Sequence, residues 1–332
     1  MQFDPQLLQQ CLFLAGPTAS GKSALAVPLA EQIGAEILCL DSMTVYRGLE
    51  IGTAKPTPAE RQRVPHHLLD LADPHEEFSV SMYLPRAEQV CREILARGRT
   101  PFFVGGSGLY LRSLLRGLFE GPAADWSFRQ AMQTLAEQEG PDSLHRRLTQ
   151  VDPVTAARLH LRDQRRIIRA LEVYELTGRP LSQLQQEQAL PIELRPRQVY
   201  WLDPDRSWLH QRIDRRVEEM FEQGLVEEVQ GLLANGVQFG RTARMALGYA
   251  EVLEHLQGSH PHGSHPHGGP TREETILAIQ QHTRQFAKRQ CTWFRNLEEC
   301  QPIPIGPGTS TLELEQELHS RFTAAHNARS NA

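Results

Sequence analysis

A glycine-rich loop near the start of the chain constrains its fold more than any other feature. Residues 16–23 read GPTASGKS, which fits the pattern G-x-x-x-x-G-K-S. The loop follows a short apolar run, CLFLAG, and leads into a helical pattern that ends at Gly34. Backbone N–H groups of such a loop converge on an anion at a helix N-terminus. This context therefore predicts a phosphate or pyrophosphate site.

The segments after the loop alternate between strand and helix patterns. AEILCL is a second apolar run that ends before Asp41, and TPFFVGGSG is a third strand that enters a glycine turn. A helical segment, 79–98, separates them. We therefore predict an α/β fold with a parallel sheet core like that of P-loop NTPases. Ligands in such sheets lie beyond the carboxyl ends of the strands, where Ser20–Ser23, Asp41 and Gly105–Ser107 are expected.

A change of pattern predicts a second domain within this core. Residues 121–195 are helical and polar, which indicates an all-α insertion domain. The P-loop core should then comprise 1–120 and 196–305, with RQVYWLD as the last strand of its sheet and helices toward the C-terminus. We expect the tail, 306–332, to be flexible.

A low-complexity segment interrupts the C-terminal part of the core. Residues 258–269 read GSHPHGSHPHGG, which is typical of a flexible linker with proline and glycine breakers. Its histidines offer an alternative, a metal site, which we favour less. They are His260, His262, His265 and His267.

Net charge gives no hint of a nucleic-acid partner, but its distribution does. The formal net charge is -5, yet residues 158–169 carry five arginines against one aspartate. Residues 284–295 carry four basic side chains, interleaved with aromatic ones, and no acidic residue. Clustered basic and aromatic residues are typical of a surface that binds a phosphate backbone. The alternative for either run is a solvated helix face.

Cysteine usage and hydropathy place the chain in a broad class. The five cysteines are scattered and never form a C-x-x-C pair, which suits a reduced, cytoplasmic protein. No apolar run is long enough to span a membrane. The first ten residues do not read as a signal peptide.

The chemistry of the loop depends on two polar residues and on one carboxylate nearby. Lys22 adds a full positive charge to the anion site, and the Ser23 hydroxyl can hold Mg²⁺. Asp41 ends the second strand and has three possible roles: a metal ligand, a general base beside the phosphates, or the N-cap of a following helix.

Seven segments between residues 12 and 297 resemble, in order, the motifs of one enzyme family. This is the tRNA dimethylallyltransferase (tRNA Δ2-isopentenylpyrophosphate transferase) family. No C-terminal zinc finger is seen, which is similar to its bacterial type. The segments are GPTASGKS, DSMTVYRGLEIGTAKP, VPHHLLDLADPHEEFSV, FVGGSGLYLRSLL, RRIIRALEVYELTGRPLS, RIDRRVEEM and RQFAKRQCTWFR.

The resemblance implies a reaction on RNA. A dimethylallyl group passes from dimethylallyl diphosphate to N6 of adenine 37 in tRNAs that read codons starting with U. The products are N6-(dimethylallyl)adenosine and diphosphate. The implied partners are a tRNA anticodon stem-loop and dimethylallyl diphosphate, with Mg²⁺ as cofactor and no membrane. We expect a cytoplasmic monomer.

The resemblance also assigns roles to particular residues. Asp41 is the general base, and Arg216, Lys22 and Ser23 act with it at the leaving diphosphate. The donor-binding residues are Gly16, Pro17, Thr18, Ala19, Ser20, Gly21, Lys22 and Ser23, and the metal ligand is Ser23. The implied tRNA contacts are Asp41, Ser42, Met43, Thr44, Ser107, Arg129, Arg165, Arg166, Ile167, Ile168, Arg169, Arg244, Met245, Ala246, Leu247, Gly248 and Tyr249.

Two other enzyme classes share the phosphate loop. An adenylate isopentenyltransferase would use a free nucleotide as acceptor, but a small acceptor needs no arginine-rich helical insertion. A small-molecule kinase would bind ATP and use the arginines in a lid. That second alternative leaves the segment DSMTVYRGLEIGTAKP unexplained.

Overall fold

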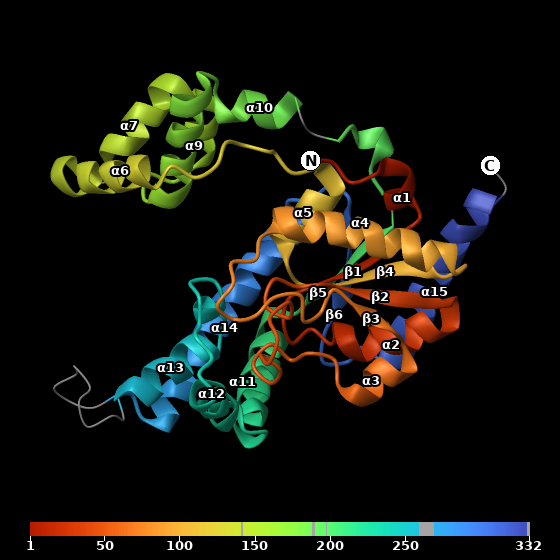
Figure 1. The fold of residues 1–332 in the computed structure, drawn as a ribbon. Coiled ribbons are helices and arrows are strands. Elements are labelled where there is room, and N and C mark those ends of the chain that lie inside the picture. The colour runs from red at the N-terminus through yellow and green to blue at the C-terminus, as the bar shows by residue number, and fades with distance from the viewer. Residues whose placement is uncertain (141, 188–189, 197, 259–268, 331–332) are drawn as a thin grey trace. The chain divides into compact units, whose positions relative to one another are not determined.

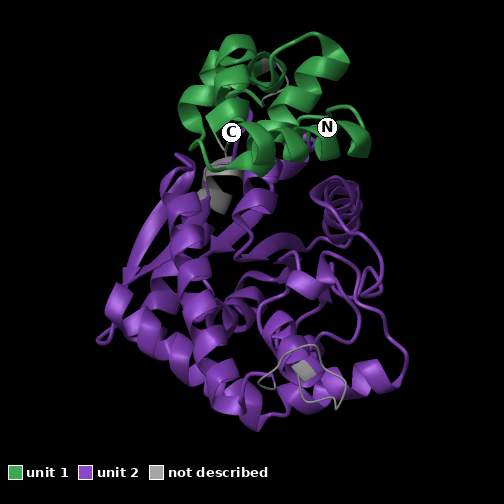
Figure 2. Cartoon of the chain, turned by 90° about the vertical axis from the view of Figure 1, so that its left-hand side faces the viewer, with its two compact units in different colours: residues 1–2, 116–192 green, residues 3–115, 193–332 purple. Residues whose placement is uncertain are grey.

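The computed structural model describes residues 1–140, 142–187, 190–196, 198–258 and 269–330. By their internal contacts these residues divide into two compact units (Figure 2). A helical unit covers 1–2 and 116–192, and a sheet unit covers 3–115 and 193–332. The sequence predicted the helical insertion at 121–195.

The sheet unit contains one sheet of six parallel strands in the order β3-β2-β4-β1-β5-β6 (Figure 1). The central strands β2, β4, β1 and β5 are apolar along nearly their whole length, as expected for strands buried on both faces. The predicted α/β class is confirmed. The strands are β1 (Leu12–Ala15), β2 (Ala35–Leu40), β3 (His66–His67), β4 (Thr100–Gly105), β5 (Val199–Pro204) and β6 (Cys300–Ile305).

Helices cover both faces of the sheet (Figure 1). On one face, α2 and α15 pack on a core that includes Leu12, Leu14 and Phe102. On the other face, where α4 and α5 lie, Phe13 stacks on Phe103 with ring centroids 5.0 Å apart. The helices around the sheet are α1 (Pro5–Gln9), α2 (Lys22–Ile33), α3 (Pro58–Arg63), α4 (Val80–Ala96), α5 (Gly108–Arg116) and α15 (Thr311–Ser330).

A second group of helices lies between β5 and β6 in the chain. The Asp205 carboxylate accepts a hydrogen bond from the Trp208 amide and so begins α11. A reciprocal capping box between Thr271 and Glu274 begins α14. The group consists of α11 (Arg206–Glu222), α12 (Leu225–Ala234), the 3₁₀ turn η2 (Ala243–Met245), α13 (Tyr249–Gly258) and α14 (Arg272–Arg295).

The helical unit has its own hydrophobic core. Leu144, Leu148, Ile167 and Ile168 are buried in it together. The unit contains α6 (Trp126–Glu139), α7 (Asp142–Val151), α8 (Pro153–Arg158), α9 (Gln164–Thr177) and α10 (Leu181–Glu187). The 3₁₀ turn η1 (Ile192–Leu194) begins at its last residue and continues into the sheet unit.

Two predictions about the C-terminal part are wrong. Residues 199–203 of RQVYWLD lie in β5, but β5 is not the last strand, because CQPIPI follows as β6. Its two prolines are tolerated because β6 is an edge strand that pairs with β5 alone. The tail is not simply flexible either: α15 begins at Thr311, and Leu314, Leu318 and Phe322 are buried against the sheet unit.

Two further points concern the predicted linker and the question of a membrane-spanning helix. The predicted linker, 258–269, lies almost entirely outside the described residues. Among the helices that the structure describes, none combines the length and apolar character needed to cross a bilayer.

The packing of α15 gives a first prediction. Leu318 is 0% exposed in the core, whereas Leu312 of the same helix is 63% exposed. We expect Leu318→Ala to lower the free energy of unfolding by about 2–5 kcal/mol, because it leaves a cavity against α2. The matched variant Leu312→Ala should change it by less than about 0.5 kcal/mol. Urea unfolding followed by circular dichroism measures both, and equal losses would contradict a packed tail helix.

Candidate active site

The glycine-rich loop connects β1 to the first turn of α2. Gly21 is the N-cap of α2 with φ at +95°, a conformation that favours glycine. Ala19 adopts φ +62° without being glycine, so the loop contains local backbone strain. The Lys22 ammonium curls back and donates to the carbonyl oxygen of Pro17 at 2.7 Å. The loop therefore has the shape of an anion cradle, with its lysine held at the rim.

A hydroxyl inside the cradle has no protein partner. Ser20 is 3% exposed, and among the described residues its Oγ has no hydrogen-bond partner. A buried hydroxyl without a partner costs free energy. An anion in the cradle would supply the missing acceptor.

Gln290 of α14 fastens the loop to the neighbouring strand end. Its Oε1 accepts from the Thr18 amide at 2.8 Å, and its Nε2 donates to the Gly106 carbonyl at 2.9 Å. A Cβ on Gly106 would lie 2.3 Å from Nε2, so only glycine leaves room for this bridge. The Thr18 amide is thus already used within the protein, as is the Ser20 amide, which donates to the Pro17 carbonyl at 3.3 Å.

The sheet register places three sequence motifs side by side. Gly105 pairs with Leu40 on one side and with Ala15 on the other. A Cβ on Gly105 would lie 2.1 Å from the Leu40 carbonyl oxygen, so the two strand ends approach more closely than a side chain allows. The phosphate loop, Asp41 and Ser107 therefore follow adjacent strand ends at one edge.

Asp41 closes a turn and begins no helix. Its Oδ1 accepts from the Met43 amide at 2.7 Å and from the Thr44 amide at 3.2 Å. Among the described residues Oδ2 has no hydrogen-bond partner. One carboxylate oxygen thus fixes the turn and the other stays available. The N-cap alternative for Asp41 is wrong, because the next helix begins at Pro58.

Three half-buried charges act on one another in this site. Burial, and then the nearby Arg216, lower the pKa of Lys22 to about 7. Burial raises the pKa of Asp41, while the Met43 and Thr44 amides, Lys22 and Arg216 oppose that rise. Burial also lowers the pKa of Arg216, which the Asp41 carboxylate opposes. Two cations thus share one carboxylate, and the group carries an excess of positive charge.

Arg212, one helical turn before Arg216, holds α11 against the loop. Its Nε donates to the Ala19 carbonyl at 2.8 Å, and its guanidinium lies over the Trp208 ring, 4.8 Å from the centroid. Ala19 also packs with Leu209 and Ile213 of α11. These contacts direct the face of α11 that carries Arg216 toward the phosphate loop.

The residues predicted to contact tRNA in the sheet unit differ in exposure. Thr44 is buried, and its hydroxyl has no partner among the described residues. Arg244 and Met245 are exposed. Ala246 and Tyr249 are buried, and the Tyr249 hydroxyl donates to Glu228 and accepts from the Gly52 amide. The described side chains of 244–249 thus divide into an exposed pair and a structural group.

The predicted RNA contacts in the helical unit divide in the same way. Arg165 and Arg166 are exposed. Arg129 forms a bidentate pair with Glu172, which is fully buried, and Arg169 pairs with the same carboxylate. Ile167 and Ile168 are buried in the hydrophobic core of the unit, and their contact with tRNA stays a prediction.

The residues present fit a magnesium ion that is shared with a phosphate ligand. Ser23 is exposed at the start of α2, beside the cradle. Across the described ranges, no group of three or more His, Cys, Asp or Glu side chains could hold a metal ion. Mg²⁺ commonly keeps several waters and binds through few protein ligands and substrate phosphates. Ser23 beside an anion cradle suits that mode.

Sequence reasoning missed two residues of this site. Gln290 lies in the basic run of α14, and its signal was a polar side chain on the helix face that is otherwise buried, next to Cys291 and Phe294. Lys55 belongs to the segment EIGTAKP, where it was noted only as part of a motif. It is buried and binds the segment that follows Asp41.

Comparisons with known proteins identify the family. A family model described as IPP transferase matches residues 44–297, and a second, described as isopentenyl transferase, matches residues 9–73. A curated relative from Trichlorobacter lovleyi, named tRNA dimethylallyltransferase 1, is 46% identical over 91% of this chain and 95% of its own.

Solved structures agree with this match. The tRNA isopentenylpyrophosphate transferase of Bacillus halodurans is 34% identical with a TM-score of 0.68, over 97% of this chain and 98% of its own. A eukaryotic dimethylallyltransferase acting on tRNA is 27% identical with a TM-score of 0.67, over 89% and 73%. The chain belongs to the IPP transferase family, and the predicted family and P-loop NTPase-like fold are confirmed.

The pKa of Lys22 predicts how anion binding depends on pH. Because the pKa in the free protein is about 7, most Lys22 side chains are neutral at about pH 8. A bound diphosphate favours the ammonium form, so binding must take up a proton, and affinity should fall as pH rises above 7. Calorimetry with a nonreactive alkyl diphosphate, in two buffers of different ionisation enthalpy, measures this uptake.

The control for this measurement is Lys22→Met, which removes the titrating group. The variant should bind more weakly and take up no proton at about pH 8. Equal proton uptake by the variant and the wild type would show that Lys22 does not titrate in this range.

Proposed function

We propose that this protein transfers a dimethylallyl group from dimethylallyl diphosphate to N6 of adenine 37 in tRNAs that read codons starting with U. The products are N6-(dimethylallyl)adenosine and diphosphate. The observation that carries the proposal is the group formed by Lys22, Arg216 and Asp41 beside the phosphate loop. Its cations suit a diphosphate, and its carboxylate suits a nucleophile that must lose a proton.

The donor would bind with its diphosphate in the loop, 16–23. The Ser20 hydroxyl and backbone amides of the loop would donate to the diphosphate oxygens, and Lys22 would leave the Pro17 carbonyl to bind them. Arg216 would meet the charge that grows on the leaving group. When bound, Mg²⁺ would add positive charge at the diphosphate, held by Ser23.

Asp41 would serve as the general base. The N6 amine forms a bond to C1 of the dimethylallyl group while the bond from C1 to the diphosphate oxygen breaks. The proton lost from N6 passes to Asp41, whose Oδ2 is not used in the turn. Burial keeps the pKa of Asp41 raised, which favours proton acceptance.

The acceptor would be read as an extruded base of an RNA loop. An adenine stacked in the anticodon loop must leave the stack before it can reach a donor in a protein site. Ser42–Thr44, Ser107 and the exposed pair Arg244 and Met245 are the residues that we propose to contact it. Arg165 and Arg166 would bind phosphates of the stem. Arg129 and Arg169 both pair with the Glu172 carboxylate, so these three side chains together would carry one net positive charge.

The proposed substrate tRNA also indicates the cellular compartment in which the enzyme would act. We propose that it acts as a monomer in the cytoplasm, where tRNA is available. Its five cysteines are all buried and none is joined to another in a disulfide, which suits a reduced compartment.

The alternatives are less well supported. The isopentenyl transferase model matches only residues 9–73, whereas the IPP transferase model extends through 297 and so includes the helical unit. A kinase would bind ATP in the loop, and it leaves the segment DSMTVYRGLEIGTAKP without a role.

A choice of acceptors tests the proposal directly. Purified protein is given Mg²⁺, labelled dimethylallyl diphosphate and, in separate reactions, an anticodon stem-loop with adenine at position 37, its guanine-37 version, or AMP. Label should enter only the adenine-37 stem-loop. Label in AMP would support the free-nucleotide enzyme instead, and label in none of the three acceptors would support a kinase.

The role of Asp41 gives a separate prediction. Asp41→Asn keeps the shape of the turn but removes the base, so the single-turnover rate should fall by about 10²–10⁴-fold. Donor and stem-loop affinities should change little. Asp73→Asn is the matched control, since Asp73 is an exposed carboxylate that pairs with Arg47. A near-normal rate for Asp41→Asn would exclude Asp41 as the base.

A further inference from the structure

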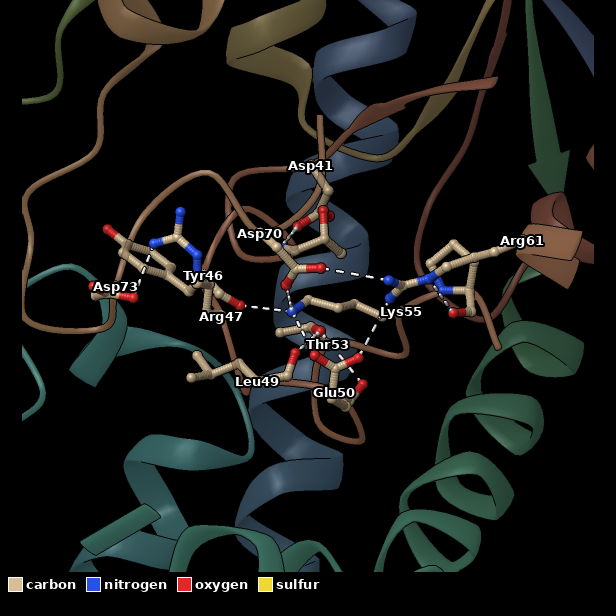
Figure 3. Close-up of polar contacts among 12 residues, drawn as sticks. Asp41, Tyr46, Arg47, Leu49, Glu50, Thr53, Lys55, Arg61, Asp70 and Asp73 are labelled. Atoms are coloured by element: carbon tan, nitrogen blue, oxygen red, sulfur yellow. Dashed lines mark hydrogen bonds and ion pairs between the residues drawn. The ribbon is translucent and has the colours of Figure 1, made fainter. Parts of the chain in front are cut away.

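Lys55 is a buried lysine, and its ammonium group donates to three oxygen atoms of nearby residues (Figure 3). Its side chain is 1% exposed. The ammonium donates to the Tyr46 carbonyl at 2.6 Å, to Glu50 Oε1 at 2.7 Å and to Asp70 Oδ1 at 2.5 Å. An ammonium has three donors, so each one is matched by an oxygen. Lys55 therefore joins three points of the chain, at 46, 50 and 70.

We infer that Lys55 is a positioning residue for Asp41: by fixing the segment 44–47 it holds the carboxylate of the general base in place. The inference rests on the proposed function, because it concerns the base of that reaction. Lys55 itself acts through the backbone and through Asp70, and it does not belong to the group of Lys22, Arg216 and Asp41.

The connection runs through a short parallel pairing. The Leu71 amide donates to the Val45 carbonyl at 2.7 Å, and the Arg47 amide donates to the Ala72 carbonyl at 2.9 Å. The Asp70 amide donates to the Thr44 carbonyl at 3.3 Å. Lys55 stabilises this pairing, because its ammonium group binds both the Tyr46 carbonyl oxygen and the Asp70 carboxylate.

Asp41 depends on the same segment. Its Oδ1 is held by the amides of Met43 and Thr44, and Thr44 is the first residue of the pairing. Movement of 44–47 would carry these amides away and release the carboxylate to other rotamers. Figure 3 draws Asp41 in the same close-up as Lys55 and its partners.

Backbone strain shows that this arrangement needs to be held. Ala54, Leu68 and Asp70 adopt φ of +47°, +64° and +55°, although none is glycine. Such conformations are unfavourable for residues with a side chain and persist only where the surroundings fix them. All three lie within two residues of Lys55 or of its partner Asp70, so the ammonium is placed where the strain is concentrated.

A neighbouring cation does not duplicate Lys55. Arg61 lies 3.4 Å from both Asp70 and Glu50, so the four side chains form a cluster of two cations and two carboxylates. Arg61 donates to the Pro56 carbonyl through Nε and is 33% exposed. Only Lys55 of this pair binds the Tyr46 carbonyl, which belongs to the segment that positions Asp41.

The test compares Lys55→Met with a variant that is destabilised elsewhere. Lys55→Met keeps the volume but removes the charge and the donors, and the single-turnover rate with saturating donor and stem-loop should fall by about 100-fold. Affinity for a nonreactive alkyl diphosphate should stay within about threefold, because the loop, 16–23, keeps its contacts. Leu318→Ala, buried against α2, is the control for a general loss of stability.

A second readout does not depend on the reaction. Hydrogen exchange should become faster in peptides that cover 42–47 and 68–72 of Lys55→Met, while the peptide that covers 16–23 stays protected. Asp70→Asn combined with Lys55→Met should slow the reaction little more than Lys55→Met alone, since the two residues act as one unit.

The outcomes separate this inference from the proposed function. A rate loss no larger than that of Leu318→Ala, or unchanged exchange at 42–47, would overturn the role of Lys55. If the wild type transfers no group to any acceptor, the proposed function fails, and the inference about the base fails with it, whereas the exchange experiment still reports whether Lys55 holds the segment.

Discussion

The site depends on an imbalance of charge among three half-buried side chains. Two cations, Lys22 and Arg216, surround a single carboxylate, Asp41, and burial disfavours the charged form of all three. Taking charges out of water is costly unless each one is paired. The free protein lowers that cost by holding the Lys22 ammonium on a carbonyl and by letting its pKa fall. An anionic ligand would balance the excess positive charge, so the charges of the free site already favour the binding of an anion.

The scaffold keeps these charges close by excluding side chains from the strand ends. Gly105 touches the Leu40 carbonyl, and Gly106 leaves room for Gln290, which in turn binds the Thr18 amide. Three strand ends and one distant helix are thereby joined at a single point. A methyl group at either glycine would push β4 away from β2 or α14 away from the loop. The tolerance for movement at this edge is therefore small, as a reaction with precise geometry requires.

The sequence allowed the site to be located but not completed. The phosphate loop and Asp41 could be found because each directly follows an apolar strand, and parallel strands end at one edge. Gln290 lies 272 residues from Thr18, and no local pattern reports a contact over that distance. The two prolines of β6 are untypical of a strand, so this edge strand was not predicted. Arginines stand on both sides of Ile167 and Ile168, so the burial of these two residues was not predicted either. These failures have one cause: tertiary packing decides which members of a motif face outward.

The same electrostatics give the proposed reaction an order. In the free protein Lys22 and Arg216 both oppose the rise in the pKa of Asp41. A diphosphate in the loop would neutralise much of the positive charge of Lys22 and Arg216. The pKa of Asp41 would then rise, because these two side chains would lower it less. A carboxylate with a higher pKa is a stronger base. Asp41 would therefore become most able to accept a proton from the amine only when the donor is already bound. After transfer, departure of the diphosphate would restore the two cations, lower the pKa of Asp41 and help it to release the proton. One group of three charges would thus couple donor binding to activation of the acceptor.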